Sequence, residues 1–324
     1  MESKGNMYVD NTMLSGYKNC PRFYQLRHVL GWRAKGTAIP LVFGLSWHDG
    51  QDIVWKHAKE LDPKTLELAA HAKFCETWEE NGLRPEPTIE DLEWMGARNP
   101  GTAQDMFHGY IKTRWKMLQE AELLGCEQPF AVPLAGISNT WYIGRLDKVV
   151  EYTGIKIVVE HKTTSSYAKV GGFQSSFIES WFSDSQVKGY QYGGGLYYPG
   201  LTNVWIDAAL VHKTVHDAFR FVPVAHQFDL LKEFLADTVN WVQKIEQNLK
   251  DGYFAKNENY CYGKYGACSF LPICRTTSDA QLRKMAEPPE GYMVDRWAPF
   301  ELLGIDKILS HNTQQGDTNE ESKA

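Results

Sequence analysis

Two carboxylates and a lysine, Asp147, Glu160 and Lys162, stand in strand-like runs whose other residues are mostly apolar. Two carboxylates held close together in such surroundings repel each other, and burying them without compensation is costly. A divalent cation such as Mg²⁺ or Mn²⁺ removes this cost because carboxylate oxygens are ligands that it prefers. A neighbouring amine can orient or deprotonate a water molecule, or stabilise developing negative charge. The three residues therefore predict metal-dependent hydrolysis of a phosphodiester bond.

The proximity of the two acids follows from a predicted β-hairpin. The dipeptide Thr153-Gly154 separates the runs Gly144–Tyr152 and Ile155–Lys162, which are rich in β-branched residues. This pattern is typical of two antiparallel strands joined by a tight turn. With a two-residue loop, Asp147 falls directly opposite Glu160, where Cβ atoms lie ~4.5–5.5 Å apart. The lysine follows Glu160 by two residues, so we expect it on the same face of the strand.

A structural alternative places the two acids on an edge strand, paired with Arg145, Lys148 or Lys162 and without a chemical role. For an isolated Asp and a Glu-x-Lys pair this reading is the commoner one. The apolar strands, the hairpin register and three further residues favour the functional reading.

Those further residues are His48, Gln186 and Tyr190, and each alone is unremarkable in type. His48 lies beside Trp47 in FGLSWHDGQ, where a histidine packed in the core is the ordinary expectation. Gln186 and Tyr190 lie four residues apart in a predicted helix, so they share one helical face.

In chain order, His48, Asp147, Glu160-His161-Lys162 and the Gln186-x-x-x-Tyr190 pair resemble the motifs of the PD-(D/E)XK nuclease superfamily, and within it the RecB-like nucleases, over roughly residues 12–275. The resemblance implies metal ligation by His48, Asp147 and Glu160. It implies a catalytic set in which Lys162 joins the two acids, while Gln186 and Tyr190 contact DNA or position the catalytic groups. His161 departs from the usual apolar residue; we expect its side chain to point away from Glu160, and we assign it no role.

The predicted fold class is α/β, with a central mixed sheet flanked by helices as in restriction-endonuclease-like proteins. We expect a single nuclease domain over 1–305, with a mainly helical insertion at 56–125 and a polar, disordered tail at 306–324. The first predicted helix is capped by Asn11 or Thr12 and has a start or kink near Pro21, and a second helix follows Gly44. A third helix runs from Asp62-Pro63 to Asn81-Gly82, and an irregular stretch at 86–100 separates it from a helix at 102–124. Strands follow from Glu127, then a helix at 184–198, two strands and a helix at 227–249.

Three of the six cysteines, Cys261, Cys268 and Cys274, are close together near the end of the chain, and Cys20 lies early. The RecB-like resemblance, which includes iron–sulfur nucleases of CRISPR adaptation, implies that these four ligate a [4Fe–4S] cluster, with the segment 255–280 closing onto Cys20. Zinc held by the same thiolates is the main alternative, although paired Cys-x₂-Cys motifs are absent. Unligated thiols are a third. We expect Cys75 and Cys126 to be buried thiols in helical surroundings.

Composition sets limits on location and partners. A net charge of −6 counts weakly against a nucleic-acid-binding protein. The 11 Trp and 16 Tyr residues suit a packed core or a surface on which bases stack. No apolar run approaches the ~18–20 residues of a membrane span, and the first residues lack the apolar region of a signal peptide. We expect a cytoplasmic protein, with phage or viral origin compatible, and cysteines that are not in disulfides.

The leading hypothesis is a Mg²⁺- or Mn²⁺-dependent deoxyribonuclease, acting as an exonuclease on DNA ends or single strands. The exonuclease preference comes from the resemblance alone. A helicase, recombination or CRISPR-type partner protein is compatible with the sequence. Two alternatives stay open: a non-cleaving DNA-binding subunit of a helicase–nuclease or recombination complex, and a site-specific endonuclease whose specificity element is the segment 56–125.

Overall fold

The computed structural model describes residues 6–168, 172–263 and 266–298. The chain divides into two compact units. Unit one comprises residues 1–36, 129–144 and 228–324, and unit two comprises 37–128 and 145–227. All candidate catalytic residues belong to unit two, and the four candidate cluster cysteines belong to unit one. The predicted tail at 306–324 lies outside the described residues.

A mixed sheet forms the centre of unit two. Strand β4 (Thr140–Tyr152) pairs antiparallel with β5 (Ile155–Thr164), which pairs parallel with β8 (Asn203–Leu210). Strand β9 (Phe219–Val224) pairs antiparallel with β8. The full strand order is β1-β4-β5-β8-β9, with β3 (Glu122–Pro133) also paired with β4. The mixed sheet confirms the predicted α/β class.

The β4–β5 connection is the predicted two-residue loop. Thr153 and Gly154 have φ values of 51° and 79°, and positive φ at both central residues is the signature of a type I′ turn. Pairing runs from Tyr152↔Ile155 to Lys148↔Val159, the register expected from the sequence. The ladder therefore ends one pair before Asp147.

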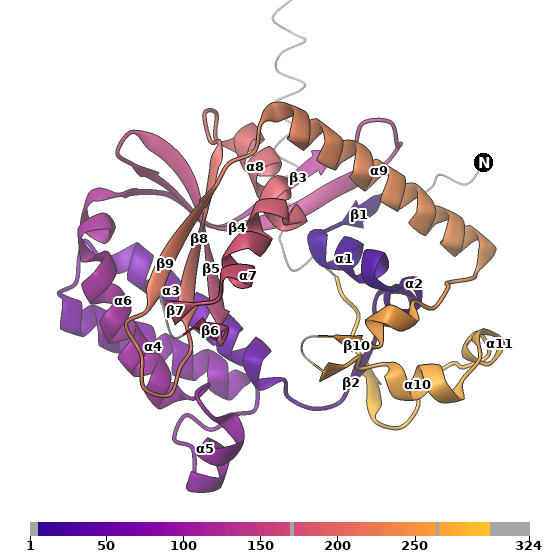
Figure 1. Ribbon diagram of the computed structural model, residues 1–324, viewed down its shortest axis with the longest axis horizontal. Helices are drawn as coiled ribbons and strands as arrows, with labels where there is room; N and C mark the ends of the chain where they lie inside the picture. Colours follow the sequence, from indigo (N-terminus) through magenta and orange to yellow (C-terminus); the bar gives the residue numbers. More distant parts are fainter. Residues whose placement is uncertain (1–5, 169–171, 264–265, 299–324) are drawn as a thin grey trace, which may run out of the picture. The chain divides into compact units, whose positions relative to one another are not determined.

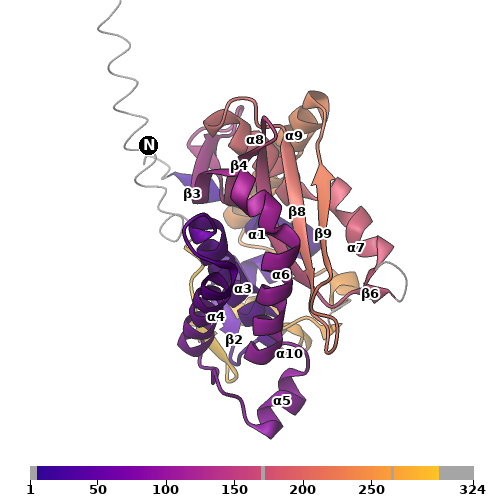
Figure 2. The same ribbon diagram turned by 90° about the vertical axis from the view of Figure 1, so that its left-hand side faces the viewer.

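Helices cover both faces of the unit-two sheet (Figures 1 and 2). Helix α3 (Ile39–His57) packs on β5 and on α4 (Pro63–Glu80) and α6 (Pro100–Glu120). Helix α8 (Ser185–Tyr197) packs on β5 and β8. The core beneath α3, α4 and α6 is aromatic; its fully buried rings include Phe43, Trp47, Phe74, Trp78 and Phe107.

The close packing of α3 depends on Gly50. A Cβ atom at this position would lie 2.3 Å from the Phe107 ring and 2.9 Å from the carbonyl oxygen of Ala70. A residue with a side chain would force α3 away from its neighbours. Gly50 is two residues from His48, so this contact also fixes the position of the candidate metal ligand.

Unit one contains one long helix, α9 (Phe228–Asp251), and a series of short elements around a small core. Strand β1 (Met7–Val9) runs parallel to Thr140–Tyr142 of β4. Helix α1 (Asn11–Asn19) packs on α9, and β2 (Trp32–Ala34) pairs with β12 (Tyr292–Val294). The remaining elements are α2 (Pro21–Tyr24), the π-helix η1 (Gln25–Val29), η3 (Glu258–Tyr260), β10 (Tyr262–Gly263), β11 (Gly266–Ala267), α10 (Leu271–Thr276) and α11 (Asp279–Leu282).

Several predicted boundaries are confirmed because local capping decides them. Helix α4 begins at Pro63, where the Asp62 side chain accepts hydrogen bonds from the backbone of Lys64 and Thr65. The first helical stretch is interrupted at Cys20, and Pro21 begins the next helix. Helices α8 and α9 match the stretches predicted at 184–198 and 227–249.

Other boundaries differ from the sequence prediction. Asp10, not Asn11 or Thr12, caps α1, because its carboxylate accepts from the backbone of Met13. Helix α3 starts at Ile39, five residues before Gly44, and Pro40 lies in its first turn.

The region around 86–127 also differs from the prediction. The stretch 86–100 contains a helix, α5 (Ile89–Met95), which begins with a Thr88–Asp91 capping box. The next helix ends at Glu120, and β3 begins at Glu122, before the expected change at Glu127. Cys126 consequently lies in a strand rather than in a helix. In the described part of the chain, no helix combines the length and the apolar character needed to cross a membrane.

Candidate active site

The structure brings His48, Asp147, Glu160 and Lys162 together in unit two. Nδ1 of His48 lies 3.0 Å from Oδ2 of Asp147, and the backbone N–H of His161 donates to the same oxygen at 3.0 Å. Lys162 donates from Nζ to Oε1 of Glu160 at 2.5 Å. The lysine therefore lies on the Glu160 face of β5, as the alternation along the strand predicts.

The edge-strand alternative is wrong for Glu160. Strand β5 lies between β4 and β8, so it is an interior strand. The side chain of Glu160 is 3 % exposed and that of Asp147 is 10 % exposed. Both acids therefore lie where water cannot offset their charges, and the surrounding groups must do so.

The environment drives the pKa values of the two acids in opposite directions. Burial, reinforced by the negative charge of Asp147, raises the pKa of Glu160 to about 7. Burial would also raise the pKa of Asp147, but the charge of His48 and its hydrogen bond, with Lys148 and Lys162, hold that pKa well below its usual range. Asp147 is the ionised member of the pair, and Glu160 resists ionisation.

The two bases of the site are both held in the charged form. Burial would lower the pKa of His48, but the carboxylate of Asp147 outweighs burial and raises it. Burial likewise opposes the charge of Lys162, while the nearby Glu160 and Asp147 raise its pKa. Without a cation, positive charge from these two residues balances the acids.

The donor set fits a divalent cation. Oε2 of Glu160 is buried and has no hydrogen-bond partner among the described residues. An acceptor oxygen left in this state is costly, and a hard cation is the group that carboxylate oxygens bind best. No set of three or more His, Cys, Asp and Glu side chains within 6–168, 172–263 and 266–298 is arranged as a ready-made metal site. His48, Asp147 and Glu160 therefore stay the candidate ligands that the sequence predicts.

The sequence reading missed a buried ion pair behind Asp147. The side chain of Lys148 is fully buried, and its Nζ lies 2.5 Å from Oδ1 of Asp52 and 3.9 Å from Oε1 of Glu127. Arg145 pairs with Glu127 at 2.6 Å. Asp52 follows His48 by one helical turn on α3, which was the one sequence signal that could have indicated it.

A second polar cluster lies on the opposite face of β5. The side chain of His161 is fully buried, with Nδ1 3.6 Å from Oδ2 of Asp207. Asp207 also accepts from the hydroxyl of Tyr110 at 2.6 Å and from Arg114 at 2.8 Å. The side chain of His161 thus points away from Glu160, as expected. Its backbone N–H still holds Asp147.

Gln186 and Tyr190 lie on the first turns of α8. The amide nitrogen of Gln186 donates to the Tyr190 hydroxyl at 2.8 Å, so the two side chains share one helical face, as expected. Asp184 caps this helix through the backbone N–H groups of Gln186 and Val187. The charge of Asp184 also contributes to raising the pKa of Lys162. Trp181, three residues before Asp184, lies 5.9 Å from Nζ of the lysine, so the chain enters α8 near the site.

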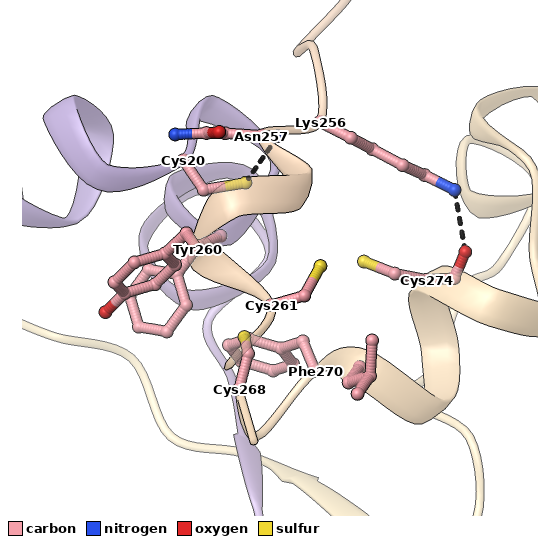
Figure 3. Close-up of a pocket in the computed structure, with 10 residues that line it drawn as sticks. Cys20, Lys256, Asn257, Tyr260, Cys261, Cys268, Phe270 and Cys274 are labelled. Carbon is pink, nitrogen blue, oxygen red and sulfur yellow. Dashed lines mark hydrogen bonds between the residues drawn. The ribbon is translucent and has the colours of Figure 1, made fainter. Parts of the chain in front are cut away.

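In unit one, Cys20, Cys261, Cys268 and Cys274 line a single pocket (Figure 3). Phe23, Phe270 and Leu271 contribute its apolar lining. The backbone N–H of Asn257 donates to Sγ of Cys20 at 3.3 Å, and Lys256 donates to the carbonyl oxygen of Cys274 at 2.6 Å.

The four thiols share this pocket, but among the described residues they are not arranged as a ready-made metal site. Burial raises the pKa of the Cys268 and Cys274 thiols, so they are neutral without a bound metal. Both also pack against the core cluster built on Trp32 and Phe270. Cys75 and Cys126 are half-buried, which corrects the expectation that they are buried thiols.

Comparison with known proteins places this geometry in a family. Residues 11–275 match the sequence profile of the PD-(D/E)XK nuclease superfamily, and the chain belongs to it. The fold is similar to the crystal structure of a protein from Eubacterium rectale named "Putative exonuclease". The TM-score is 0.51 at 14 % identity, over 91 % of this chain and 92 % of that one. No curated protein matches the sequence.

Replacing Glu160 by Gln should separate metal binding from folding. At pH 8 without metal, the melting temperature of Glu160→Gln should lie on the order of 2–4 °C above that of the wild type. The substitution removes a buried carboxylate whose ionisation is disfavoured by burial and by the charge of Asp147. Added Mn²⁺ should raise the melting temperature of the wild type but not of the variant. Glu151→Gln, on the neighbouring strand, is the control and should keep the Mn²⁺ response. A Glu160→Gln protein that still gains stability from Mn²⁺ would exclude Glu160 as a ligand.

The Mn²⁺ affinity should depend on pH. The folded-state pKa of Glu160, about 7, lies above its ordinary value of 4.5, so the native state retains this proton between those values and a cation must displace it. Because the pKa of His48 is also raised, a cation must displace a second proton there, which weakens binding further at low pH. Calorimetric titration should therefore show affinity rising about tenfold per pH unit, for each proton displaced, up to about pH 7. Equal affinity at pH 6 and pH 7.5 would contradict this account of the site.

Proposed function

We propose that the chain is a Mg²⁺- or Mn²⁺-dependent deoxyribonuclease that acts as an exonuclease on DNA ends or single strands. The observation that carries the proposal is the pair of buried carboxylates, Asp147 and Glu160, with an unpaired Glu160 oxygen beside the ammonium of Lys162. Membership of the PD-(D/E)XK nuclease superfamily supports the hydrolytic class. The name of the Eubacterium rectale protein supports the exonuclease assignment.

The residues of the chain have distinct roles in this proposal. The bound cation supplies Lewis acidity toward the scissile phosphate and its attacking water. Asp147, fixed by His48 and by the backbone N–H of His161, presents an ionised carboxylate in one position. Lys162 has a raised pKa, so it acts as an ammonium that orients the water and stabilises charge on the phosphoryl oxygens, not as the general base.

Gln186 and Tyr190 position the DNA strand rather than perform the chemistry. Their mutual hydrogen bond fixes both side chains on the face of α8. The start of this helix lies near Lys162, since Trp181, just before it, lies 5.9 Å from Nζ of the lysine. A strand whose phosphate reaches Lys162 would therefore pass the first turns of α8.

We also propose that Cys20, Cys261, Cys268 and Cys274 hold a structural [4Fe–4S] cluster, with zinc as the less favoured occupant. The four thiols share one pocket although Cys20 is more than two hundred residues from the others in sequence. Ligation would tie α1–α2 to the segment around α10 and so stabilise unit one.

The test of the nuclease is digestion of end-labelled single- and double-stranded DNA with Mg²⁺, Mn²⁺ or EDTA. The wild type should cut only with metal, and Lys162→Ala should lose at least about a hundredfold in rate, since it removes a charge aimed at the developing negative charge. Progressive loss of nucleotides from an end would support the exonuclease assignment.

Lys156→Ala is the matched control, because Lys156 lies on the same strand, six residues before Lys162, and donates to the carbonyl oxygen of Pro199 at 3.0 Å. It should cut as the wild type does. Discrete fragments from a defined duplex would favour a site-specific endonuclease instead. If folded wild type binds DNA but cuts no substrate with either metal, the non-cleaving binding subunit becomes the better description, and a search for an activating partner protein follows.

The cluster predicts the metal content of anaerobically purified protein. It should absorb near ~400 nm and contain iron and sulfide close to about four each per chain. Cys20→Ser and Cys268→Ser should lose iron together and lower the melting temperature of the protein. Each removes one ligand of the same site.

Cys75→Ser serves as the control for the loss of a thiol, because Cys75 lies on α4 in unit two and does not line the pocket. It should keep its iron and its stability. Colourless protein with one bound zinc would show that zinc, and not an iron–sulfur cluster, occupies the pocket. Cys20→Ser behaving like Cys75→Ser would remove Cys20 from the ligand set.

A further inference from the structure

An aromatic segment returns to the catalytic lysine from the end of β5. The chain continues through β6 (Tyr167–Ala168), β7 (Gly172–Phe173), α7 (Ser175–Ser180) and the 3-10 helix η2 (Trp181–Ser183), part of which Figure 1 shows. Nζ of Lys162 lies 5.9 Å from the centroid of the Trp181 ring. This distance is within the range of a cation–π contact, so η2 borders the candidate active site.

Trp181 is supported from inside the protein by other aromatic rings. Phe177 meets its ring edge-on at a centroid distance of 5.6 Å, and Phe173 stacks on Phe177 at 6.1 Å. Phe173 is buried. This row of rings fixes the indole without using the next residue, Phe182.

Phe182 is a large apolar side chain left 49 % exposed on η2. Its backbone is nevertheless anchored, because Nε2 of His226 lies 2.9 Å from its carbonyl oxygen. His226 is held in turn by the buried side chain of Gln191 on α8, which accepts from the His226 backbone N–H at 2.9 Å and donates to its carbonyl oxygen at 2.8 Å. An exposed ring is thus presented from a fixed main chain, one residue after the tryptophan that lies beside Lys162.

We propose that Phe182 is a stacking surface for an unpaired DNA base next to the phosphate held at Lys162. This inference rests on the proposed function and names the residue that would select unpaired strands. An aromatic face stacks on any base, whereas the bases inside a duplex already have both faces covered. The surface would therefore favour single strands and opened ends over continuous duplex, with little dependence on sequence.

The position of Phe182 fits this role better than a role in folding. A side chain used for packing would be turned into the core, as those of Phe173 and Ile178 are. Phe182 instead follows directly after the residue that contacts the ammonium, so a base and its phosphate could meet the ring and Lys162 together. The ammonium of Lys162 would bind the phosphate, and the ring of Phe182 would stack on the base.

The test is equilibrium binding of short oligo(dT) that carries one 2-aminopurine, measured in EDTA so that no cleavage occurs. Phe182→Ala should weaken binding about tenfold, in line with the loss of one stacked base. Phe182→Leu, which keeps apolar area but has no flat face, should behave like Phe182→Ala. Phe182→Tyr should bind as the wild type does and should preserve the quenching of 2-aminopurine at one position of the strand.

Trp94→Ala is the control, since Trp94 is 60 % exposed on α5 and has no part in the proposal. It should leave binding unchanged, and binding of closed circular duplex should be the same for all variants. Wild-type affinity for oligo(dT) in Phe182→Ala, or no binding of oligo(dT) by the wild type, would overturn the stacking surface. Absence of cleavage with an intact Phe182 effect would instead overturn only the nuclease.

Discussion

The repulsion between two carboxylates on adjacent interior strands is the constraint around which unit two is organised. Strand β5 cannot expose Glu160, because it lies between β4 and β8. The charges are balanced by groups from several elements: His48 from α3, Lys162 from β5 and the buried Lys148 from β4. Each of these bases is held charged by the acids that it neutralises. The arrangement keeps the charges balanced without metal, yet leaves one Glu160 oxygen available for a cation.

Strand β5 separates two polar clusters that have different tasks. On one face lie Glu160 and Lys162, and on the other lies His161, with burial holding its pKa well below the usual range. Asp207, Tyr110 and Arg114 complete the second cluster through short hydrogen bonds. The side chains of His161 and Asp207 on this second face are buried, so the value of the cluster is geometric. It fixes β5, and the backbone N–H of His161 transmits that position to Asp147.

The parts of the site that sequence could predict are those set by local periodicity. The two-residue turn fixed the register of β4 and β5, and alternation put Lys162 on the face of Glu160. Helical spacing paired Gln186 with Tyr190. Helical spacing places Asp52 one turn after His48, but its partner Lys148 could not be predicted, since the ion pair joins residues 96 positions apart through the packing of α3 on the sheet. Helix α5 was missed because Pro and Gly around it suggested irregular structure, while its capping box acts over only four residues.

The two candidate metal centres differ in what prepares them. In the carboxylate site, ionised Asp147 attracts a cation before it arrives, and only Glu160 and His48 must release protons. In the thiol pocket, burial keeps Cys268 and Cys274 protonated, so ligation must expel protons and gains nothing from an existing charge. Such a site depends on the bonds to its own metal. Because these two cysteines pack on the small core of unit one, the energy of those bonds would contribute directly to the stability of that unit. The carboxylate centre, by contrast, rests on a core of buried aromatic rings that does not depend on the cation.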